Sequence, residues 1–188
     1  LFDEIEKAHP DILNVFLQVM DDGRLTDVSG RTIDFTQTII IMTSNACTSY
    51  IQKSVAAGKS MAHIKTELLE KELSTYFRPE FLNRFDMISV FRPLSMEHVQ
   101  LIAQRLIAKI RKNLEEKGIT ISVASEAIVK FAKDGFDPVF GARPLRRVLQ
   151  DQVNDPIANA LISGKLTRRD EVLFDKTGIM EIKKARPL

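Results

Sequence analysis

The sequence predicts an α/β portion followed by a smaller α+β unit, and three patterns indicate this. Residues 38–43 form an apolar run without alternation, which is typical of a strand covered on both faces in a parallel sheet. Apolar residues recur at helical spacing in several segments. After Pro93, helical patterns are mixed with short strand-like segments. We therefore expect two domains, residues 1–92 and residues 93–188.

In residues 1–92 a helix is expected over 10–20, because Pro10 suits a first helical turn and apolar residues share one face. Asp21, Asp22 and Gly23 end it. The polar, glycine-punctuated segment 24–35 predicts a hairpin-like loop. The other expected elements are the buried strand 38–43, a helix over 61–76 with Ile64, Leu68, Leu69 and Leu73 on its apolar face, and a short strand over 87–91.

In residues 93–188 the longest expected element is a helix over 95–117, capped by Ser95 and ended by Gly118. Ser125 is expected to cap a second helix that ends near Gly135. Pro144 suits the first position of a third helix. The last expected elements are a helix that starts or kinks at Asp155-Pro156 and ends at Gly164, and strands over 119–123, 171–175 and 179–183.

The composition excludes several classes of protein. The 188 residues are 44% hydrophobic and 28% charged, which is ordinary for a globular chain. The 27 basic and 25 acidic residues are interspersed and give a formal net charge of +2, so nucleic acid is not an expected partner. No apolar run approaches the roughly 20 residues of a membrane helix, so a membrane is not expected either. The single cysteine, Cys47, excludes a disulfide framework and fits a reducing compartment, cytoplasmic or organellar.

Two acidic residues follow a short apolar stretch at the start of the chain. Asp3 and Glu4 would lie at the carboxyl end of a strand, where open parallel sheets bind ligands. One carboxylate suits Mg²⁺, and its neighbour can orient or deprotonate an attacking water. An acidic start of a helix is the alternative. Asn45 ends the buried strand and can hydrogen-bond a water and a phosphate oxygen, with a turn or a helix cap as its alternative.

Two arginines are candidates for contact with phosphate. Arg84 precedes a predicted strand and could neutralise charge on a transferring phosphoryl group across a subunit boundary, although a surface ion pair is the usual role of such an arginine. Arg143 precedes Pro144 at the positive end of a helix, which makes sense if an anion binds there. Arg146 and Arg147 are interpreted as a solvated face. A nucleic-acid binder that uses these arginines is the alternative, and it would show steep salt dependence.

Two other sequence patterns resemble ligand sites but do not meet their requirements. Ala57-Gly58-Lys59-Ser60 resembles the end of a phosphate-binding loop, but the position five places before Gly58, where that loop needs glycine, is Lys53. The three histidines have no metal-ligand spacing and Cys47 has no second thiol, so we expect no structural zinc site.

Five motifs occur in unbroken order along the chain: Leu1-Phe2-Asp3-Glu4-Ile5-Glu6-Lys7-Ala8-His9-Pro10, Asp22-Gly23-Arg24-Leu25-Thr26-Asp27, Met42-Thr43-Ser44-Asn45, Phe77-Arg78-Pro79-Glu80-Phe81-Leu82-Asn83-Arg84 and Gly141-Ala142-Arg143-Pro144-Leu145. Together they closely resemble the Clp AAA+ chaperone family. The resemblance is to its second nucleotide-binding domain, from Walker B onward, and to its carboxy-terminal small domain.

The resemblance implies a partial P-loop NTPase (AAA+) parallel sheet, the cofactors ATP and Mg²⁺, and a role for each candidate residue. Asp3 would be the Walker B aspartate that meets Mg²⁺ through water, and Glu4 the glutamate that activates water. Asn45 would be the sensor-1 residue, Arg84 the arginine finger offered to the neighbouring subunit, and Arg143 the sensor-2 arginine. The stretch similar to the second pore loop runs from Gly23 to Phe35 and begins with Gly23, Arg24, Leu25, Thr26 and Asp27.

The resemblance also implies partners. The family forms hexameric rings of identical subunits, which thread unfolded or aggregated client proteins with ATP and work with co-chaperones. Members that feed a peptidase carry an aliphatic-Gly-aromatic or aliphatic-Gly-aliphatic tripeptide between sensor 1 and the arginine finger, whereas the only glycine there, Gly58, stands between Ala57 and Lys59. This favours a ClpB-like disaggregase over a ClpA- or ClpC-like unfoldase, which is the alternative.

The chain opens at Leu1 with neither an initiator Met nor a signal-peptide pattern, so we expect it to be a piece of a longer polypeptide. In this family the Walker A loop and the main aromatic pore loop precede Walker B, and the sequence starts after both. Without the lysine and backbone amides of Walker A, the isolated chain is expected to bind nucleotide poorly and to be inactive, while the parent protein is an ATPase. A non-catalytic oligomerisation module is the alternative for the chain alone.

Overall fold

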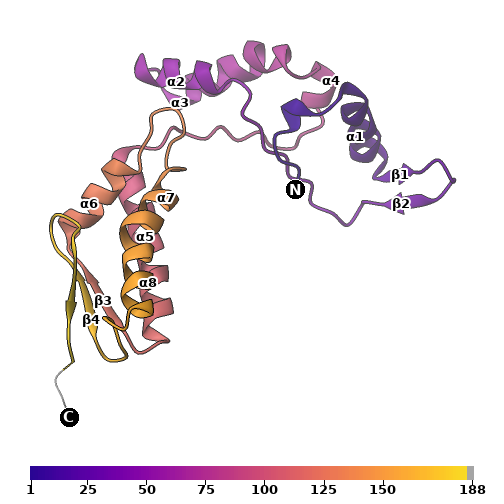
Figure 1. Ribbon diagram of the computed structural model, residues 1–188. Helices are drawn as coiled ribbons and strands as arrows, with labels where there is room; N and C mark the ends of the chain where they lie inside the picture. The colour runs from indigo at the N-terminus through magenta and orange to yellow at the C-terminus, as the bar shows by residue number, and fades with distance from the viewer. Residues whose placement is uncertain (186–188) are drawn as a thin grey trace. The chain divides into compact units, whose positions relative to one another are not determined.

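Helices joined to short strands make up the chain, and they fall into two units, Leu1–Arg92 and Pro93–Leu188 (Figure 1). The computed structural model describes residues 1–185. The mixture of helix and sheet predicted from the sequence is confirmed. None of the helices in residues 1–185 is both long and apolar enough to cross a bilayer.

The first unit is mostly helical, with one small hairpin. Helix α1 (Pro10–Asp22) begins as predicted, with Pro10 in its first turn, and it ends at Gly23, which has a φ of 63°. The other elements are a 3-10 turn (Ile5–Lys7), β1 (Arg24–Thr26) paired antiparallel to β2 (Thr32–Asp34), α2 (Thr48–Ala56), α3 (Met61–Glu67), a π-helical turn (Leu68–Glu72), a second 3-10 turn (Leu73–Thr75) and α4 (Pro79–Leu82).

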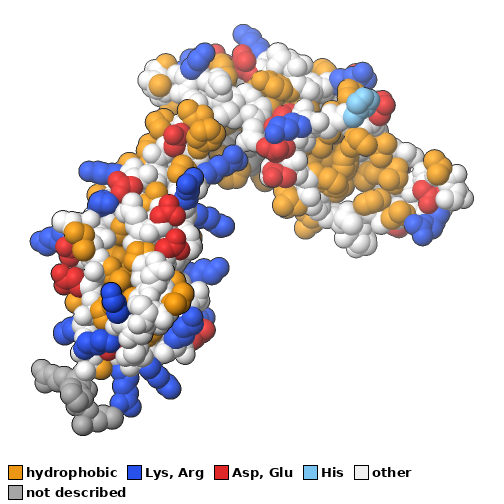
Figure 2. All heavy atoms as spheres, in the orientation of Figure 1, with side chains coloured by type: hydrophobic (Ala, Val, Ile, Leu, Met, Phe, Trp, Pro, Cys, Tyr) orange, Lys and Arg blue, Asp and Glu red, His pale blue; other side chains and the backbone are white. Residues whose placement is uncertain are grey.

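A buried apolar cluster connects these helices to the start of the chain. Its buried members are Ile5, Cys47, Ile64, Leu68, Leu73, Phe77 and Phe81. Other large apolar side chains of this unit remain on the surface, and Figure 2 shows hydrophobic atoms gathered over α1 and the hairpin. The core therefore fixes the 3-10 turn, α3 and α4, while α1 keeps part of its apolar face exposed, with Ile12 and Val15 at 49% and 41%.

The predicted buried strand over 38–43 is wrong for the described chain. Its only pairing there is a single parallel bridge between Phe2 and Met42. The Phe2 amide donates to the Ile41 carbonyl at 2.9 Å, and the Thr43 amide donates to the Phe2 carbonyl at 2.8 Å. Ile39 is 89% exposed. A strand needs hydrogen-bonding partners along its length, and within residues 1–185 the backbone bonds of this segment beyond its adjoining turn go only to Phe2 and, through the Thr43 carbonyl, to the Ile5 amide.

Two further expectations in this unit need correction. Residues 87–91 form no strand, because within residues 1–185 this segment has no pairing partner, and Met87 and Phe91 are 76% and 85% exposed. The expected helix over 61–76 is divided by the π-helical turn, which leaves Leu69 38% exposed. Sequence reasoning also missed α2, because its residues are mostly small and polar.

The second unit is a helical layer on a three-stranded sheet. Helix α5 (Met96–Glu115) is capped by Ser95, as predicted, in a capping box with His98. Strand β3 (Thr120–Val123) pairs parallel to β4 (Glu171–Phe174), and β4 pairs antiparallel to β5 (Met180–Lys183). The remaining elements are α6 (Ser125–Asp134), α7 (Leu145–Leu149), a π-helical turn (Gln150–Asn154) and α8 (Asp155–Ile162) (Figure 1).

The core of this unit lies between α5, α6, the segment from α7 to α8, and the sheet. Its largest buried side chains include Phe131, Ile107, Ile121, Leu145 and Val172. The strands predicted at 119–123, 171–175 and 179–183 are confirmed within a residue or so at each end. Ser125 does not cap α6, because Ala124 occupies the cap position and the Ser125 hydroxyl donates to Glu126 at 3.0 Å.

Gly135, which caps the end of α6, lies against Leu145 at the start of α7. A Cβ atom at this position would lie 2.6 Å from Cα and 2.7 Å from Cδ1 of Leu145, whose side chain is buried. We expect Gly135→Ala to lower the free energy of unfolding by about 1–3 kcal/mol, because the backbone of α7 must move to make room. Thermal unfolding of the 188-residue chain measures this. Lys133→Ala, on the exposed face of the same helix, is the control with a change within about 0.5 kcal/mol. Equal melting temperatures for the two variants would contradict the close approach.

Asp170 is a buried carboxylate that fixes the segment after β5. Its side chain accepts hydrogen bonds from Lys184 Nζ at 2.8 Å, from the Ala185 amide at 3.0 Å, and from both the amide and the hydroxyl of Thr167. The bond from Lys184, followed by those from Ala185 and Thr167, holds the pKa of Asp170 well below its ordinary value of 3.8.

Because the folded-state pKa is depressed, the stabilisation by Asp170 is complete above 3.8 and is lost as the pH falls through the folded value. We expect Asp170→Asn to lower the melting temperature at neutral pH, and the gap between variant and wild type to narrow below about pH 4. Melting curves across pH measure this gap. Asp151→Asn, at an exposed carboxylate 3.7 Å from Arg147, should leave the whole profile unchanged. A gap that stays constant into acid would contradict the role of the charge.

Candidate functional site

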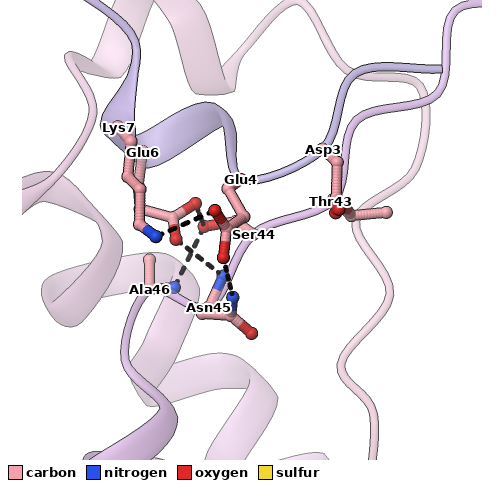
Figure 3. A network of polar contacts seen from close by, with 8 residues as sticks. All are labelled: Asp3, Glu4, Glu6, Lys7, Thr43, Ser44, Asn45 and Ala46. Carbon is pink, nitrogen blue, oxygen red and sulfur yellow. Dashed lines mark hydrogen bonds and ion pairs between the residues drawn. The ribbon is translucent and has the colours of Figure 1, made fainter.

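The bridge between Phe2 and Met42 brings the two candidate strand ends side by side. Asp3 and Glu4 follow one partner and Asn45 follows the other, so the predicted trio lies together (Figure 3). The Thr43 hydroxyl donates a hydrogen bond to Asp3 Oδ1, and Asn45 Nδ2 donates to Glu4 Oε1 at 3.3 Å. One short parallel contact therefore gathers two carboxylates and an amide from segments 40 residues apart.

Glu4 has an unusual backbone. It lies in the left-handed region, with φ 55° and ψ 46°, which is costly for a residue with a side chain and is most often kept at functional sites. Its other carboxylate oxygen accepts a 2.8 Å hydrogen bond from Lys7 Nζ, and the side chain is 40% exposed. Glu4 is thus held by Asn45 and Lys7 while it remains open to water.

Glu6 is a member of this cluster that sequence reasoning did not select. One of its carboxylate oxygens accepts from Ser44 Oγ at 2.7 Å and the other from the Asn45 amide at 3.1 Å (Figure 3). Burial raises the pKa of Glu6, but the hydrogen bonds from Ser44 and Asn45 outweigh it and hold the pKa below its ordinary value. Glu6 therefore fixes the backbone of Asn45. Its only sequence signal was its place two residues after Glu4.

The candidate pore loop is the hairpin of β1 and β2. Arg24, Leu25 and Thr26 pair with Asp34, Ile33 and Thr32. Asp27 closes the turn, because its Oδ1 accepts from the amides of Ser29 at 2.8 Å and Arg31 at 2.9 Å. Val28 is fully exposed at the tip. The hairpin thus presents a short, ordered tip with an apolar side chain.

Arg84 follows α4, and the structure places it against α1. Its Nε donates to Asp21 Oδ1, and this hydrogen bond, together with the charge of Asp21, raises the pKa of Arg84. The surface ion pair considered from the sequence is therefore present. Within the described residues the structure joins Arg84 to Asp21 and gives it no contact with Asp3, Glu4 or Asn45.

Arg143 belongs to the second unit, in the loop that leads from α6 to α7. An antiparallel bridge between Asp137 and Gly141 closes this loop, and Asp137 accepts from the amides of Val139 and Phe140. Arg143 is exposed. It lines a groove of about 510 Å³ whose other walls are Leu94, Ile102, Leu106, Phe140, Gly141, Ala142 and Arg146.

Asp3 and Glu4 are the candidate Mg²⁺ ligands of the cluster. Across residues 1–185 no three His, Cys, Asp or Glu side chains converge as a complete protein metal site. Asp3 and Glu4 suit Mg²⁺ nonetheless, since this ion usually takes one or two carboxylates and completes its shell with waters and phosphate oxygens. The cluster fits a metal that arrives with a phosphate ligand.

Two family models and several known proteins match the chain. Residues 1–88 match a family described as AAA domain (Cdc48 subfamily), and residues 94–174 match the C-terminal, D2-small domain, of ClpB protein. The chain is 49% identical over 166 residues to the chaperone protein ClpB of Meiothermus ruber, covering 88% of this chain and 19% of that protein. It is 47% identical over 176 residues to the ATP-dependent Clp protease ATP-binding subunit ClpE of Bacillus subtilis, covering 93% of this chain and 25% of that protein.

A solved structure is similar as well. The extended conformation of the S. cerevisiae Hsp104:casein complex superposes with a TM-score of 0.82 at 32% identity, covering 97% of this chain and 32% of that chain. The chain spans about a fifth to a quarter of the length of the bacterial relatives named here.

Proposed function

This chain belongs to the Clp family of AAA+ chaperones, and from that premise we propose that the protein containing it hydrolyses ATP to unfold or disaggregate other proteins. The single observation that carries the proposal is the cluster of Asp3, Glu4 and Asn45 at two adjoining strand ends. This is the arrangement expected where a phosphate chain, its metal and an attacking water meet.

The side chains of the cluster divide the work. Asp3, held by the Thr43 hydroxyl, would meet Mg²⁺ through water. Glu4 would orient the attacking water and accept its proton, and Asn45 would hydrogen-bond the water and a phosphate oxygen from the other side. Mg²⁺, when bound, would supply positive charge that offsets the charge of the phosphates. Glu6 keeps Asn45 in place throughout, because it holds the Asn45 amide.

Two arginines would complete the site. We assign Arg84 to the transferring phosphoryl group of the neighbouring subunit, in a ring of identical subunits expected to be a hexamer. Arg143 would contact the phosphates from the small domain. An arginine suits both tasks because its planar guanidinium donates to two phosphate oxygens at once.

The hairpin is assigned to the client polypeptide. The exposed Val28 at its tip offers apolar contact that is independent of sequence, and ordered strand pairing supports it on both sides. Unfolded or aggregated proteins, assisted by a co-chaperone, are the proposed partners, and the cytoplasm or an organelle matrix is the proposed location.

An unfoldase that serves a peptidase is the second candidate, and the similarity to ClpE favours it. Gly58 argues against it. This glycine ends α2 with a φ of 77°, and its neighbour Lys59 is held by Glu67 at 2.7 Å. The tripeptide Ala57-Gly58-Lys59 thus places an ion-paired lysine where a peptidase-docking motif has an apolar side chain.

The experiment that separates the two candidates uses the full-length protein, ATP and a heat-aggregated reporter enzyme. A disaggregase restores reporter activity without a peptidase, with or without an added co-chaperone. An unfoldase subunit leaves the reporter inactive, and the peptidase degrades the reporter once it is added. The latter result would replace the first candidate with the second.

The 188 residues alone are proposed not to turn over ATP, because they contain no Walker A loop. Titration of fluorescent ATP onto the isolated chain tests this. Weak binding, with a Kd near millimolar, is the expected result, whereas stoichiometric tight binding would contradict it.

A further inference from the structure

Asp21, in the last turn of α1, is the partner that holds Arg84. Nε of Arg84 donates to Asp21 Oδ1, and the two side chains are 40% and 43% exposed. The two residues are 63 positions apart, so the pair ties the end of α1 to the segment after α4 within one unit.

The pair uses one edge of the guanidinium. Arginine carries five N–H donors in a rigid fork, and in the part of the chain that the structure describes Asp21 is the one hydrogen-bond acceptor of the Arg84 side chain, at Nε. The four N–H groups on the Nη atoms are left for an external acceptor. An arginine fixed at Nε and free at both Nη atoms is oriented for two-point contact with phosphate.

The backbone of Arg84 is fixed independently. Phe81, which is 2% exposed, packs edge-to-face against Phe85 with ring centroids 5.2 Å apart. The Arg84 amide donates to the Phe81 carbonyl at 3.2 Å. Packing therefore fixes the backbone position of Arg84, and Asp21 fixes the position of its guanidinium.

The end of α1, which carries Asp21, is also joined to the hairpin through Gly23. The Gly23 amide donates to the Val19 carbonyl at 2.9 Å, and the Phe35 amide donates to the Gly23 carbonyl at 2.7 Å. A Cβ on Gly23 would lie 2.7 Å from Cγ2 of Thr36, so the base of the hairpin packs directly on the end of α1. The hairpin thus contacts the helical turn that carries Asp21.

We propose that Asp21 is a positioning residue for Arg84 and links it to the hairpin, so that a polypeptide pressing on the hairpin changes turnover in the neighbouring subunit. The proposal rests on the proposed role of Arg84 at that neighbour's ATP site. Asp21 itself touches neither ATP nor the phosphates.

The first test is a double-mutant cycle in the full-length protein, with kcat and KM for ATP measured for wild type, Asp21→Ala, Arg84→Ala and the double variant. Asp21→Ala is expected to lower kcat by about 10- to 100-fold with little change in KM, since a misplaced arginine loses contact mainly with the transition state. Added to Arg84→Ala, it should change nothing further. If the losses in kcat of the two single variants multiply in the double variant, the proposal is overturned, because Asp21 would then act through some other group.

The second test asks whether the effect reaches the neighbour. Wild-type subunits are mixed with Glu4→Gln subunits, or with subunits that carry Glu4→Gln and Asp21→Asn together. Asp21→Asn keeps the size of the side chain and removes the negative charge that pairs with Arg84. The double variant should lower turnover of the wild-type subunits further and reduce stimulation by casein. Equal turnover and stimulation in the two mixtures would overturn the proposal.

Two controls separate this inference from the proposed function. Asp22→Ala removes the adjacent exposed carboxylate and should leave kcat within about twofold of wild type. If Arg84→Ala retains full turnover, the arginine assignment fails and the inference fails with it. If Arg84→Ala is inactive while Asp21→Ala matches wild type, the inference alone fails.

Discussion

Glu4→Gln in the full-length protein should bind ATP and fail to hydrolyse it. Glutamine keeps the length of the side chain and an oxygen for the 3.3 Å hydrogen bond from Asn45, but it cannot accept a proton from water. Loss of a general base costs about 10²- to 10⁴-fold in kcat. Two quantities are measured on the same preparation: fluorescent-nucleotide binding should persist, and ATP turnover should be lost.

Lys7→Ala is the matched control for this prediction. It removes the 2.8 Å ion pair to Glu4 and leaves the carboxylate in place. Because this pair is exposed, we expect its loss to lower turnover by less than about tenfold. Unchanged hydrolysis in Glu4→Gln would show that Glu4 is structural, and the roles assigned to Asp3 and Asn45 would then have to be reopened as well.

Arg84→Ala is expected to reduce turnover on the order of 10³-fold or more, the usual cost of a missing arginine finger. ATP affinity should persist, since an arginine finger stabilises mainly the charge of the transition state. Arg84→Lys should not restore turnover, because an ammonium keeps the charge but lacks the planar fork and the Nε that contacts Asp21.

Arg78→Ala provides the matched control for Arg84, because Arg78 lies six residues earlier in the same motif and is exposed. Its turnover should stay within about twofold of wild type.

Subunit mixing tests whether Arg84 acts on the neighbouring subunit. Arg84→Ala subunits should regain turnover when their neighbours are Glu4→Gln subunits with intact Arg84. Failure of this rescue would show that Arg84 acts within its own subunit.

Elements that depend on local signals could be predicted from the sequence. Pro10 and Gly23 delimit α1, and Ser95 starts α5, because caps and punctuating residues act over a few positions. The strand over 38–43 could not be predicted correctly in this way. Its apolar composition predicts a strand with neighbours in a sheet, but in the described chain its one β-bridge is to Phe2.

The candidate site shows the same division. Asp3, Glu4 and Asn45 could be grouped in advance because strand ends share an edge, and the Phe2–Met42 bridge does bring them together. Glu6 and Asp21 could not be selected, because each matters only through one contact across the fold, with the Asn45 amide and with Arg84. Nothing in their local sequence distinguishes them from ordinary surface acids.

The π-helical turn between α7 and α8 has a consequence for insertions and deletions. The buried residues Leu145, Leu149, Val153 and Ile157 recur every four positions, and on a regular helix each such step drifts by about 40°. The wide turn at Gln150–Asn154 takes up this drift and returns all four to one face. Deleting one residue there would rotate α8 by about 100° and turn Ile157 out of the core. This tract should therefore accept substitutions at its exposed positions far more readily than any change of length.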